Sequence, residues 1–220
     1  MQFLYSPHAS ATTLTITGEE YKYLFKVRRF KVGSVVDFRN MQDEMLYRYK
    51  VEAIDKKEAT LIMIDSYHDS KKLEKSLHIL WCMIDTKVIE KTLPMLNQVG
   101  VSKITFFYCE RSQKNFKLDL GRLEKILINS SQQCGRSDLM SLEIMSTMDE
   151  VLQKYPHFSV MDFGGSYDTS NISSIMIGCE GGFSEAERQK LQNFPKIGIK
   201  SPFILKSETA ALTFAAKVLI

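Results

Sequence analysis

Three closely spaced glycines near the C-terminus are suited to hold a small ligand against the backbone. They are Gly178, Gly181 and Gly182. They follow the apolar run Ile175–Ile177, and the capping box formed by Ser184 and Glu187 predicts a helix just after them. A strand that leads through glycines into a helix N-terminus presents backbone N–H groups to a ligand. The ligand can approach closely because glycine has no side chain.

A second loop of this kind lies downstream. The apolar run Ile197–Ile199 leads into the loop Lys200–Lys206, and Ser207 is expected to cap a last helix that reaches Val218. The four histidines are far apart in the sequence and none lies in either loop, which argues against a metal site or a catalytic triad. Because GxGxxG and GxxxxGK[ST] motifs are absent as well, the pattern predicts a site that binds and positions its ligand.

The composition is that of an ordinary globular protein. The chain has 220 residues, of which 44% are hydrophobic and 25% charged, and its net charge of +3 is too small to indicate a nucleic-acid partner by itself. No apolar run approaches the roughly 18 residues of a membrane span, and a signal peptide is not evident, so a cytoplasmic protein without membrane contact is expected. The four cysteines are scattered without a CxxC pair, so free thiols are expected rather than disulfides.

Residues 1–68 are predicted to form a small β-rich domain, followed by a polar linker over 69–76. Short apolar or alternating stretches separated by turn residues predict strands at 3–5, 14–16, 35–39, 46–54 and 59–64. One helix is expected from Glu19 to about Val27.

The end of this helix carries cations interleaved with aromatic residues. The cations are Lys22, Lys26, Arg28, Arg29 and Lys31, and the aromatic residues are Tyr21, Tyr23, Phe25 and Phe30. Such a patch can bind phosphates and stack on bases. A solvated helix face above core aromatics explains the same pattern, and from this segment alone that explanation is favoured.

The chain from residue 77 to 220 is predicted to be an α/β domain with a parallel sheet. Apolar runs at 77–84, 104–109, 142–145, 158–163 and 175–177 alternate with helical patterns. Helices are expected at 86–98, kinked or ended early at Pro94, at 119–133 and after the capping box of Thr147 and Glu150. Ligands of such a sheet bind at the carboxyl ends of its strands, where both loops described above lie.

The segments IGCEGGFSEAE, from Ile177, and SPFILKSETAA, from Ser201, form a distinctive pair. They closely resemble IGPEGGFS and LGxRILRxETA, the paired signatures of the ribosomal RNA small subunit methyltransferase E family. The resemblance extends to YLFKVRRFKVGSVVDF near the N-terminus, to ERSQ at Glu110–Gln113 and to SSQQCGRSD at Ser130–Asp138. These motifs occur in the family's order over nearly the whole chain, which makes the resemblance specific.

The resemblance implies an N-terminal PUA-like β-barrel that binds RNA, joined to a SPOUT-type α/β domain with a C-terminal trefoil knot. It also implies a homodimer with the site at its interface and S-adenosyl-L-methionine as cofactor, without a metal. The implied activity is methylation of N3 of a specific uridine in small-subunit (16S) ribosomal RNA, free or in the assembled small subunit. Two alternatives remain open: a SPOUT methyltransferase that acts on another RNA, and a non-enzymatic RNA-binding module.

The family's site residues carry over to the matching positions of this chain. The implied cofactor contacts are Phe163, Gly164, Gly178, Glu180, Gly181, Gly182, Ser201, Ile204, Leu205, Ser207 and Thr209. The implied RNA contacts are Lys26, Arg28, Arg29, Arg111, Gln133, Arg136 and Lys206, with Lys114 and Lys117 extending the phosphate-binding surface. The catalytic candidates are Arg136, which would stabilise charge on the uracil oxygens, and the nearby carboxylates Glu180 and Glu208.

Some of these residues have structural alternatives, and the chain departs from the family pattern at several positions. Glu208 is equally suited to stabilise the first turn of the last helix, and Arg111 to pair with Glu110 or another acid. The departures are Cys179, Ser201, Phe203 and Lys206, which stand where the family has proline, glycine, arginine and arginine. Lysine lacks the planar fork of arginine and cannot form the same bidentate contact, whereas the cofactor loops are retained.

Overall fold

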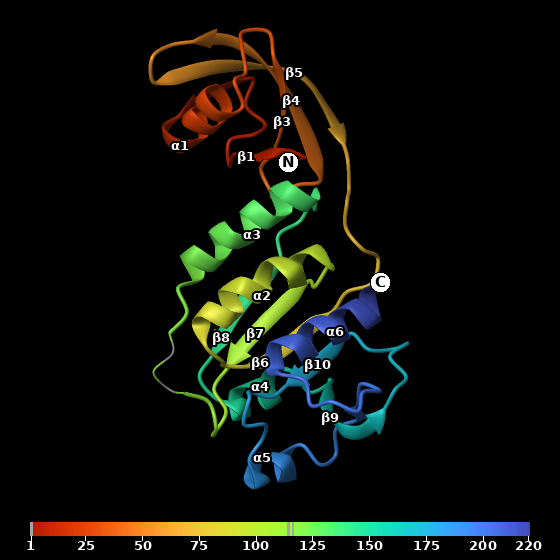
Figure 1. Cartoon of the computed structure of the whole chain (residues 1–220). Coiled ribbons are helices and arrows are strands. Elements are labelled where there is room, and N and C mark those ends of the chain that lie inside the picture. Colours follow the sequence, from red (N-terminus) through yellow and green to blue (C-terminus); the bar gives the residue numbers. More distant parts are fainter. Residues whose placement is uncertain (1, 114, 116) are drawn as a thin grey trace. The chain divides into compact units, whose positions relative to one another are not determined.

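The computed structural model describes residues 2–113, 115 and 117–220, and the chain divides into two compact units. The first contains residues through Lys72 together with Ser131–Leu139, and the second contains Leu73–Ser130 and Met140–Ile220. Figure 1 labels their helices and strands. The domain boundaries expected at residues 68 and 77 stay a prediction. The compact units differ from them in that 131–139 belongs with the first unit.

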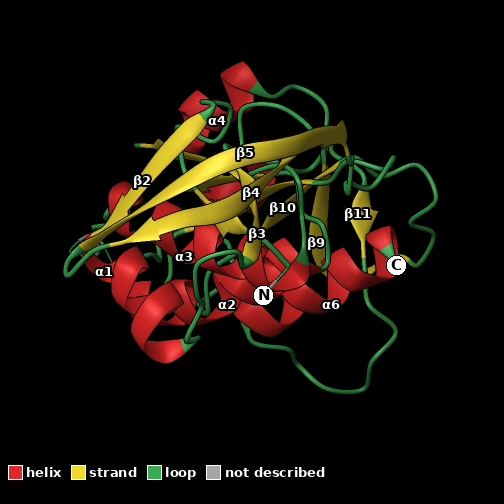
Figure 2. Cartoon of the chain, turned by 90° about the horizontal axis from the view of Figure 1, so that it is seen from above, coloured by secondary structure: helices red, strands yellow, loops and turns green. Residues whose placement is uncertain are grey.

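The first unit is built on a five-stranded sheet in the order β1-β3-β4-β5-β2. The strands are β1 (Leu4–Tyr5), β2 (Thr13–Thr17), β3 (Val35–Arg39), β4 (Met45–Ile54) and β5 (Glu58–His68), and each overlaps a predicted strand. β1 pairs with β3 in parallel, and the other neighbours are antiparallel. Figure 2 shows the long strands β4 and β5 side by side. In β2, Leu14 and Ile16 are buried between exposed threonines, because alternate side chains of a strand point to opposite faces of the sheet.

The helix expected over residues 19–27 is α-helical only in its first part. α1 spans Gly18–Tyr21 and continues as a π-helical turn, η1, over Lys22–Val27. The N–H of Arg28, the residue after η1, donates to the carbonyl of Tyr23 over 2.9 Å. Arg29 follows with a φ of 58°, which is uncommon for a residue with a side chain. The buried side chains of this segment are Tyr21, Leu24 and Phe25. A π turn is rare and often marks a functional site, and the sequence pattern did not indicate it.

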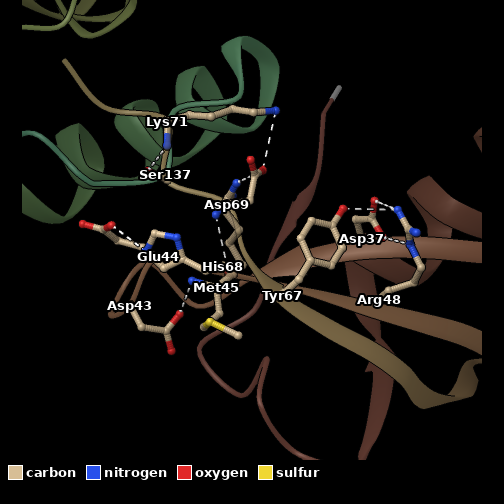
Figure 3. Close-up of polar contacts among 11 residues, drawn as sticks. Asp37, Asp43, Glu44, Met45, Arg48, Tyr67, His68, Asp69, Lys71 and Ser137 are labelled. Atoms are coloured by element: carbon tan, nitrogen blue, oxygen red, sulfur yellow. Dashed lines mark hydrogen bonds and ion pairs between the residues drawn. The ribbon is translucent and has the colours of Figure 1, made fainter.

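Polar contacts tie residues 131–139 to the chain that follows β5. The N–H of Lys71 donates to the Ser137 hydroxyl over 2.9 Å, and the N–H of Ser137 donates to the Lys71 carbonyl over 3.2 Å. Figure 3 shows this pair and the Lys71 ammonium directed at Asp69. The Asp69 carboxylate pairs with the guanidinium of the buried Arg39 over 2.5 Å. The buried charge of Arg39 is therefore compensated within this unit.

The second unit contains a six-stranded sheet, in the order β11-β9-β10-β6-β7-β8, in which every neighbouring pair is parallel. The strands are β6 (His78–Cys82), β7 (Lys103–Phe107), β8 (Ser141–Met145), β9 (Ser159–Ser166), β10 (Ser174–Ile177) and β11 (Lys196–Ile197). The remaining helices are α2 (Thr86–Gln98), α3 (Leu120–Cys134), α4 (Met148–Lys154), α5 (Glu185–Lys190) and α6 (Ser207–Leu219). The predicted α/β sheet is confirmed. Within the described residues, no helix has both the length and the apolar character needed to cross a membrane.

Helix α2 continues through Pro94, where the sequence predicted a kink or an early end. Asp85 caps the helix by accepting hydrogen bonds from two N–H groups of the first turn, and Gly100, at a φ of 95°, follows its end as expected. Leu93 and Leu96, on either side of the proline, are fully buried. Packing of this apolar face holds the helix together despite the missing N–H.

The expectation that all cysteines are free is wrong for two of them. Cys82 ends β6 and Cys109 follows β7, and their side chains form a disulfide with the Cα atoms 5.9 Å apart. Cys134 and Cys179 are free thiols. Cys82 and Cys109 are 27 residues apart in the sequence, and it is the pairing of two neighbouring strands that brings them together.

A polar network surrounds His78, the first residue of β6. Nε2 of its ring lies 2.8 Å from the hydroxyl of Thr105, which itself donates to Glu143 over 2.8 Å, so the ring nitrogen is the donor to Thr105. Lys103, Lys154 and Tyr155 also contact the Glu143 carboxylate. Burial, with the Lys103 ammonium nearby, lowers the pKa of His78 to about 4.

His78 should make the protein sensitive to mild acid. In the unfolded chain its imidazole takes up a proton near pH 6.5, whereas in the folded protein it does so only near pH 4. As the pH falls from 7 to 5, the unfolded state binds more protons, and the free energy of unfolding should fall by about 1 kcal/mol after allowance for solvent screening of the partly exposed ring. Urea denaturation at both pH values measures this loss. A His78→Gln variant keeps a donor for Thr105 but does not titrate, so it should lose less stability, and a parallel loss in both proteins would contradict the prediction.

Candidate functional site

A cavity of about 390 Å³ opens at the carboxyl ends of β9, β10 and β11. Its walls come from the end of β9, the glycine turn after β10 and the loop between β11 and α6, all in the second unit. The volume lies in the range of small-molecule sites, roughly 300–1,000 Å³. The two loops predicted from the sequence therefore converge on one ligand-sized cavity.

Most of the residues predicted to contact a cofactor line this cavity. They are Phe163, Gly164, Gly178, Glu180, Gly182, Ser201, Ile204, Leu205 and Ser207, and Lys206 joins them. Gly181 and Thr209 are not among the lining residues. An added Cβ at Gly181 would lie 3.3 Å from the Arg111 side chain, and Thr209 lies in the first turn of α6.

The glycine turn has the geometry that its sequence predicted. Ser184 Oγ accepts from the N–H of Glu187 over 3.2 Å, and Glu187 Oε2 accepts from the N–H of Ser184 over 2.9 Å, so the capping box is present. Gly182 has a φ of 64°, a conformation that favours glycine. Its N–H donates to the Cys179 carbonyl over 2.9 Å. Cys179, which replaces the family's proline, thus takes part in the turn through its backbone.

The loop after β7 stabilises the glycine turn through two hydrogen bonds. The second carboxylate oxygen of Glu187 accepts from the N–H of Glu110 over 2.9 Å, and Glu187 is only 3% exposed. The guanidinium of Arg111 donates to the Gly181 carbonyl over 2.7 Å. Arg111 therefore supports the glycine turn and does not pair with Glu110, and its RNA contact stays a prediction. The capping box predicted the first bond of Glu187 but not the second, since Glu110 is distant in the sequence.

Ser207 does not cap α6 with its side chain, contrary to expectation. Lys206 occupies the cap position, and Ser207 is the first helical residue. The Ser207 hydroxyl donates to the Gly178 carbonyl over 2.5 Å and accepts from the indole N–H of Trp81 over 2.8 Å. Both Ser207 and Trp81 are buried. This hydroxyl therefore joins the two cavity loops, and Trp81, which sequence reasoning missed because it belongs to no motif, orients it from β6.

Large apolar side chains stand exposed at the mouth of the cavity. Phe163, Phe203 and Ile204 are 76%, 75% and 83% exposed although they line it. Clustered apolar surface of this kind marks a place where a ligand or another chain binds.

Beside the glycine turn, Asp162 pairs with Arg188 over 2.8 Å. Sequence reasoning missed this ion pair because no motif contains either residue.

The two carboxylates predicted as candidates for catalysis occupy different positions. Glu180 is exposed and lines the cavity. Glu208 is half-buried in the first turn of α6, where its charge suits the helix dipole, and it does not line the cavity. The catalytic roles of both stay predictions. In the described part of the chain, no three His, Cys, Asp or Glu side chains are grouped so as to hold a metal ion.

Most of the other predicted site residues belong to the first unit, and their roles in RNA binding and catalysis stay predictions. Arg136 is buried, and its guanidinium forms a bidentate pair with Asp138 at 2.9 and 2.7 Å. Gln133 is exposed near the end of α3. Lys26, Arg28 and Arg29, in and after η1, are all exposed. Of the two lysines expected to extend the RNA surface, Lys117 is exposed and belongs to the second unit, and Lys114 lies outside the described residues.

Family models match both parts of the chain. An RNA methyltransferase domain matches residues 71–219, and an RNA methyltransferase PUA domain matches residues 16–64. The chain is 42% identical over 222 residues to the ribosomal RNA small subunit methyltransferase E of Helicobacter pylori, with 98% of each protein covered. The protein of the same name from Bacillus subtilis is 24% identical, with 92% of this chain and 88% of that protein covered.

Solved structures share the fold. A methyltransferase of Legionella pneumophila, determined with bound S-adenosylmethionine, matches with a TM-score of 0.84 at 20% identity, over 99% of this chain and 96% of the other. The ribosomal RNA small subunit methyltransferase E of Neisseria gonorrhoeae, also determined with bound S-adenosylmethionine, matches with a TM-score of 0.81 at 20% identity over the same shares. At these identities the likeness concerns the fold alone.

Proposed function

This chain belongs to the ribosomal RNA small subunit methyltransferase E family, and on that basis we propose that it transfers a methyl group from S-adenosyl-L-methionine to N3 of a uridine in small-subunit (16S) ribosomal RNA. The name of the Helicobacter pylori relative supports the class of substrate. The family resemblance supports the uridine and its N3 atom. The observation that carries the proposal is the convergence of the predicted cofactor loops on one cavity of suitable volume.

The residues of the cavity fit the proposed cofactor. Gly178 and Gly182 leave the backbone of the turn open to close approach. Among the described residues, the N–H groups of Ile204 and Leu205 have no hydrogen-bond partner, so they are available to the edge of an adenine ring. The exposed side chain of Ile204 would be covered by the ring.

Methyl transfer mainly requires the protein to position the methyl donor and the acceptor nitrogen. When bound, S-adenosylmethionine supplies an electrophilic methyl group on a sulfonium. Ser207 holds the two cavity loops together, and Glu187 fixes the glycine turn from the neighbouring loop. Such fixed geometry favours in-line attack by the acceptor nitrogen, which can supply much of the rate.

Uridine N3 carries a proton that must leave during methyl transfer. A base, or donors that stabilise negative charge on the uracil oxygens, should therefore act at the site. Glu180, at the cavity, and Glu208, in the adjoining helix turn, are the proposed carboxylates. Arg136 is the proposed donor to the uracil oxygens, and its buried position beside Asp138 holds the guanidinium in one orientation.

We also propose that the protein is a cytoplasmic homodimer with the site at the dimer interface. Each chain would contain a C-terminal trefoil knot. The exposed apolar side chains of Phe163 and Phe203 support the dimer, because a partner chain would remove them from water. Light scattering of the purified protein tests the dimer, with a monomer mass as the contrary result.

Calorimetric titration with S-adenosylmethionine tests the cofactor assignment. The wild-type protein should bind, and a Gly178→Val variant should bind roughly 100-fold more weakly because of overpacking. The new Cβ would already lie 3.4 Å from Gly182 and 3.5 Å from the Phe183 ring, so the added methyl groups must take space from the cavity. Gly121→Ala, in α3, is the control that should bind like the wild type. A folded wild-type protein that does not bind would favour the RNA-binding module instead.

Mass spectrometry of nucleosides tests the target. Small ribosomal subunits that lack the modification, incubated with the protein and S-adenosylmethionine, should yield N3-methyluridine from their ribosomal RNA. A methyl group at another position would overturn the N3 assignment and retain the methyltransferase. Methylation of transfer RNA alone would favour a SPOUT enzyme with another substrate.

A further inference from the structure

We propose that a second cavity, in the first unit, binds one unstacked nucleotide of the RNA substrate. Its base would lie against the aromatic rings of Tyr23 and Phe30, with its phosphate near Arg28. This inference rests on the proposed function, because the ligand is the RNA. The sequence indicated that this segment can bind phosphates and stack on bases, and the cavity adds a defined place for one base.

The cavity has the size and lining that a single base requires. Its volume is about 210 Å³, below the roughly 300–1,000 Å³ of sites for larger ligands, so it suits one ring system. The buried apolar lining residues are Phe3, Leu4, Leu24 and Val36, and the more accessible ones are Gln2, Tyr23, Arg28, Phe30, Val35 and Asp37. An apolar floor with half-buried aromatic rings is the kind of surface on which bases stack.

Unusual backbone geometry places the aromatic wall. Tyr23 and Leu24 belong to the π-helical turn, and the N–H of Phe30 donates back to the Leu24 carbonyl over 3.1 Å. Arg29, which directly precedes Phe30, has a φ of 58°. Such conformations cost energy and concentrate at binding sites, where the surrounding structure holds them. Here the π-helical turn and the left-handed Arg29 reverse the direction of the chain, so that Phe30 and Tyr23 line the same cavity.

The charges around the cavity favour a polyanion. Arg28, Arg29 and Lys31 are exposed and form no ion pair with another described residue, whereas Lys22 pairs with Glu19 over 2.7 Å. Unpaired cations beside aromatic rings are the combination that binds single-stranded nucleic acid. A second copy of this chain is a poorer occupant, because a two-fold contact would bring the same cations together.

Asp37, which lines this cavity, is a hydrogen-bond acceptor held in one position. Both oxygens of Asp37 are held by Arg48, at 2.8 and 3.0 Å, and Figure 3 shows this pair with Tyr67 beside it. Arg48 neutralises the carboxylate, so Asp37 does not repel a phosphate. Its remaining lone pairs can accept an N–H of a base edge, as in recognition of unstacked bases.

Binding of two matched oligomers tests the pocket. Fluorescence anisotropy compares a short single-stranded RNA of mixed sequence with a chain of abasic tetrahydrofuran phosphates of the same length. The wild-type protein should prefer the RNA roughly tenfold or more, since stacking on an aromatic ring is lost without bases. Phe30→Leu, which keeps apolar volume, should weaken RNA binding roughly tenfold and leave abasic binding unchanged. Arg28→Gln should weaken both, and Lys57→Gln, an exposed lysine elsewhere in the unit, should weaken neither to this extent.

The possible outcomes test the nucleotide pocket and the proposed methyltransferase function independently. Equal binding of both oligomers by the wild type, or RNA binding that Phe30→Leu leaves intact, would overturn the pocket. Calorimetry of the same samples with S-adenosylmethionine tests the enzyme independently. Base-dependent binding that requires Phe30, in a protein that does not bind S-adenosylmethionine, would support the pocket and reject the methyltransferase.

Discussion

Gly165→Ala is expected to lower the free energy of unfolding by about 3 kcal/mol or more and to abolish S-adenosylmethionine binding. Gly165 lies in β9, where β11 approaches closely. A Cβ at this position would lie 2.6 Å from the backbone nitrogen of Ile197 and 2.6 Å from the carbonyl carbon of Lys196. Backbone atoms cannot turn away as a flexible side chain does, so the two strands must separate. The cavity opens at the ends of these strands and would lose a wall.

Gly164→Ala is the matched control for this prediction. Nothing lies within 4 Å of a Cβ at Gly164, but its φ of 73° is unfavourable for alanine. The expected loss of stability is about 1–2 kcal/mol, from backbone strain alone. Chemical denaturation of both variants measures the difference in stability, and titration of Gly165→Ala with S-adenosylmethionine measures the loss of binding. Equal stability of the two would show that the close approach at Gly165 does not exist.

Ser207→Ala should destabilise the protein by about 2–4 kcal/mol and weaken S-adenosylmethionine binding roughly tenfold or more. The substitution leaves the Trp81 indole N–H and the Gly178 carbonyl without their partner in a buried position. Each unsatisfied group costs about 1–3 kcal/mol. Affinity should fall as well, because the hydroxyl is the direct link between the glycine turn and the loop that precedes α6.

Ser201→Ala provides the control for stability, since Ser201 lines the same cavity but is exposed and, among the described residues, its side chain hydrogen-bonds only with Phe203. Its effect on stability should stay within about 0.5 kcal/mol. Trp81→Phe removes the indole donor and should weaken binding in the same direction as Ser207→Ala. Calorimetry and denaturation of the three variants supply the comparison. If Ser207→Ala bound S-adenosylmethionine as tightly as the wild type, the buried link would have no role in cofactor binding.

The sequence by itself determined the order of most strands and helices and the two loops that line the cavity. Alternation of apolar runs with helical patterns predicted the parallel sheet, and glycines with the capping box of Ser184 and Glu187 predicted the turn after β10. These signals were sufficient because their partners are close in the chain, so local geometry decides them. The family resemblance named several residues that line the cavity, while Gly181 and Thr209, which it also named, do not line it.

Only the tertiary structure decided the contacts between distant segments. Ser207 has the features of a helix cap, yet its hydroxyl binds Trp81 and Gly178. Cys82 and Cys109 carry no spacing signal, yet the register of β6 and β7 pairs them. A hydrogen bond or a disulfide requires two groups within a few ångströms. When those groups are far apart in the chain, only the packing of strands and loops determines whether they meet.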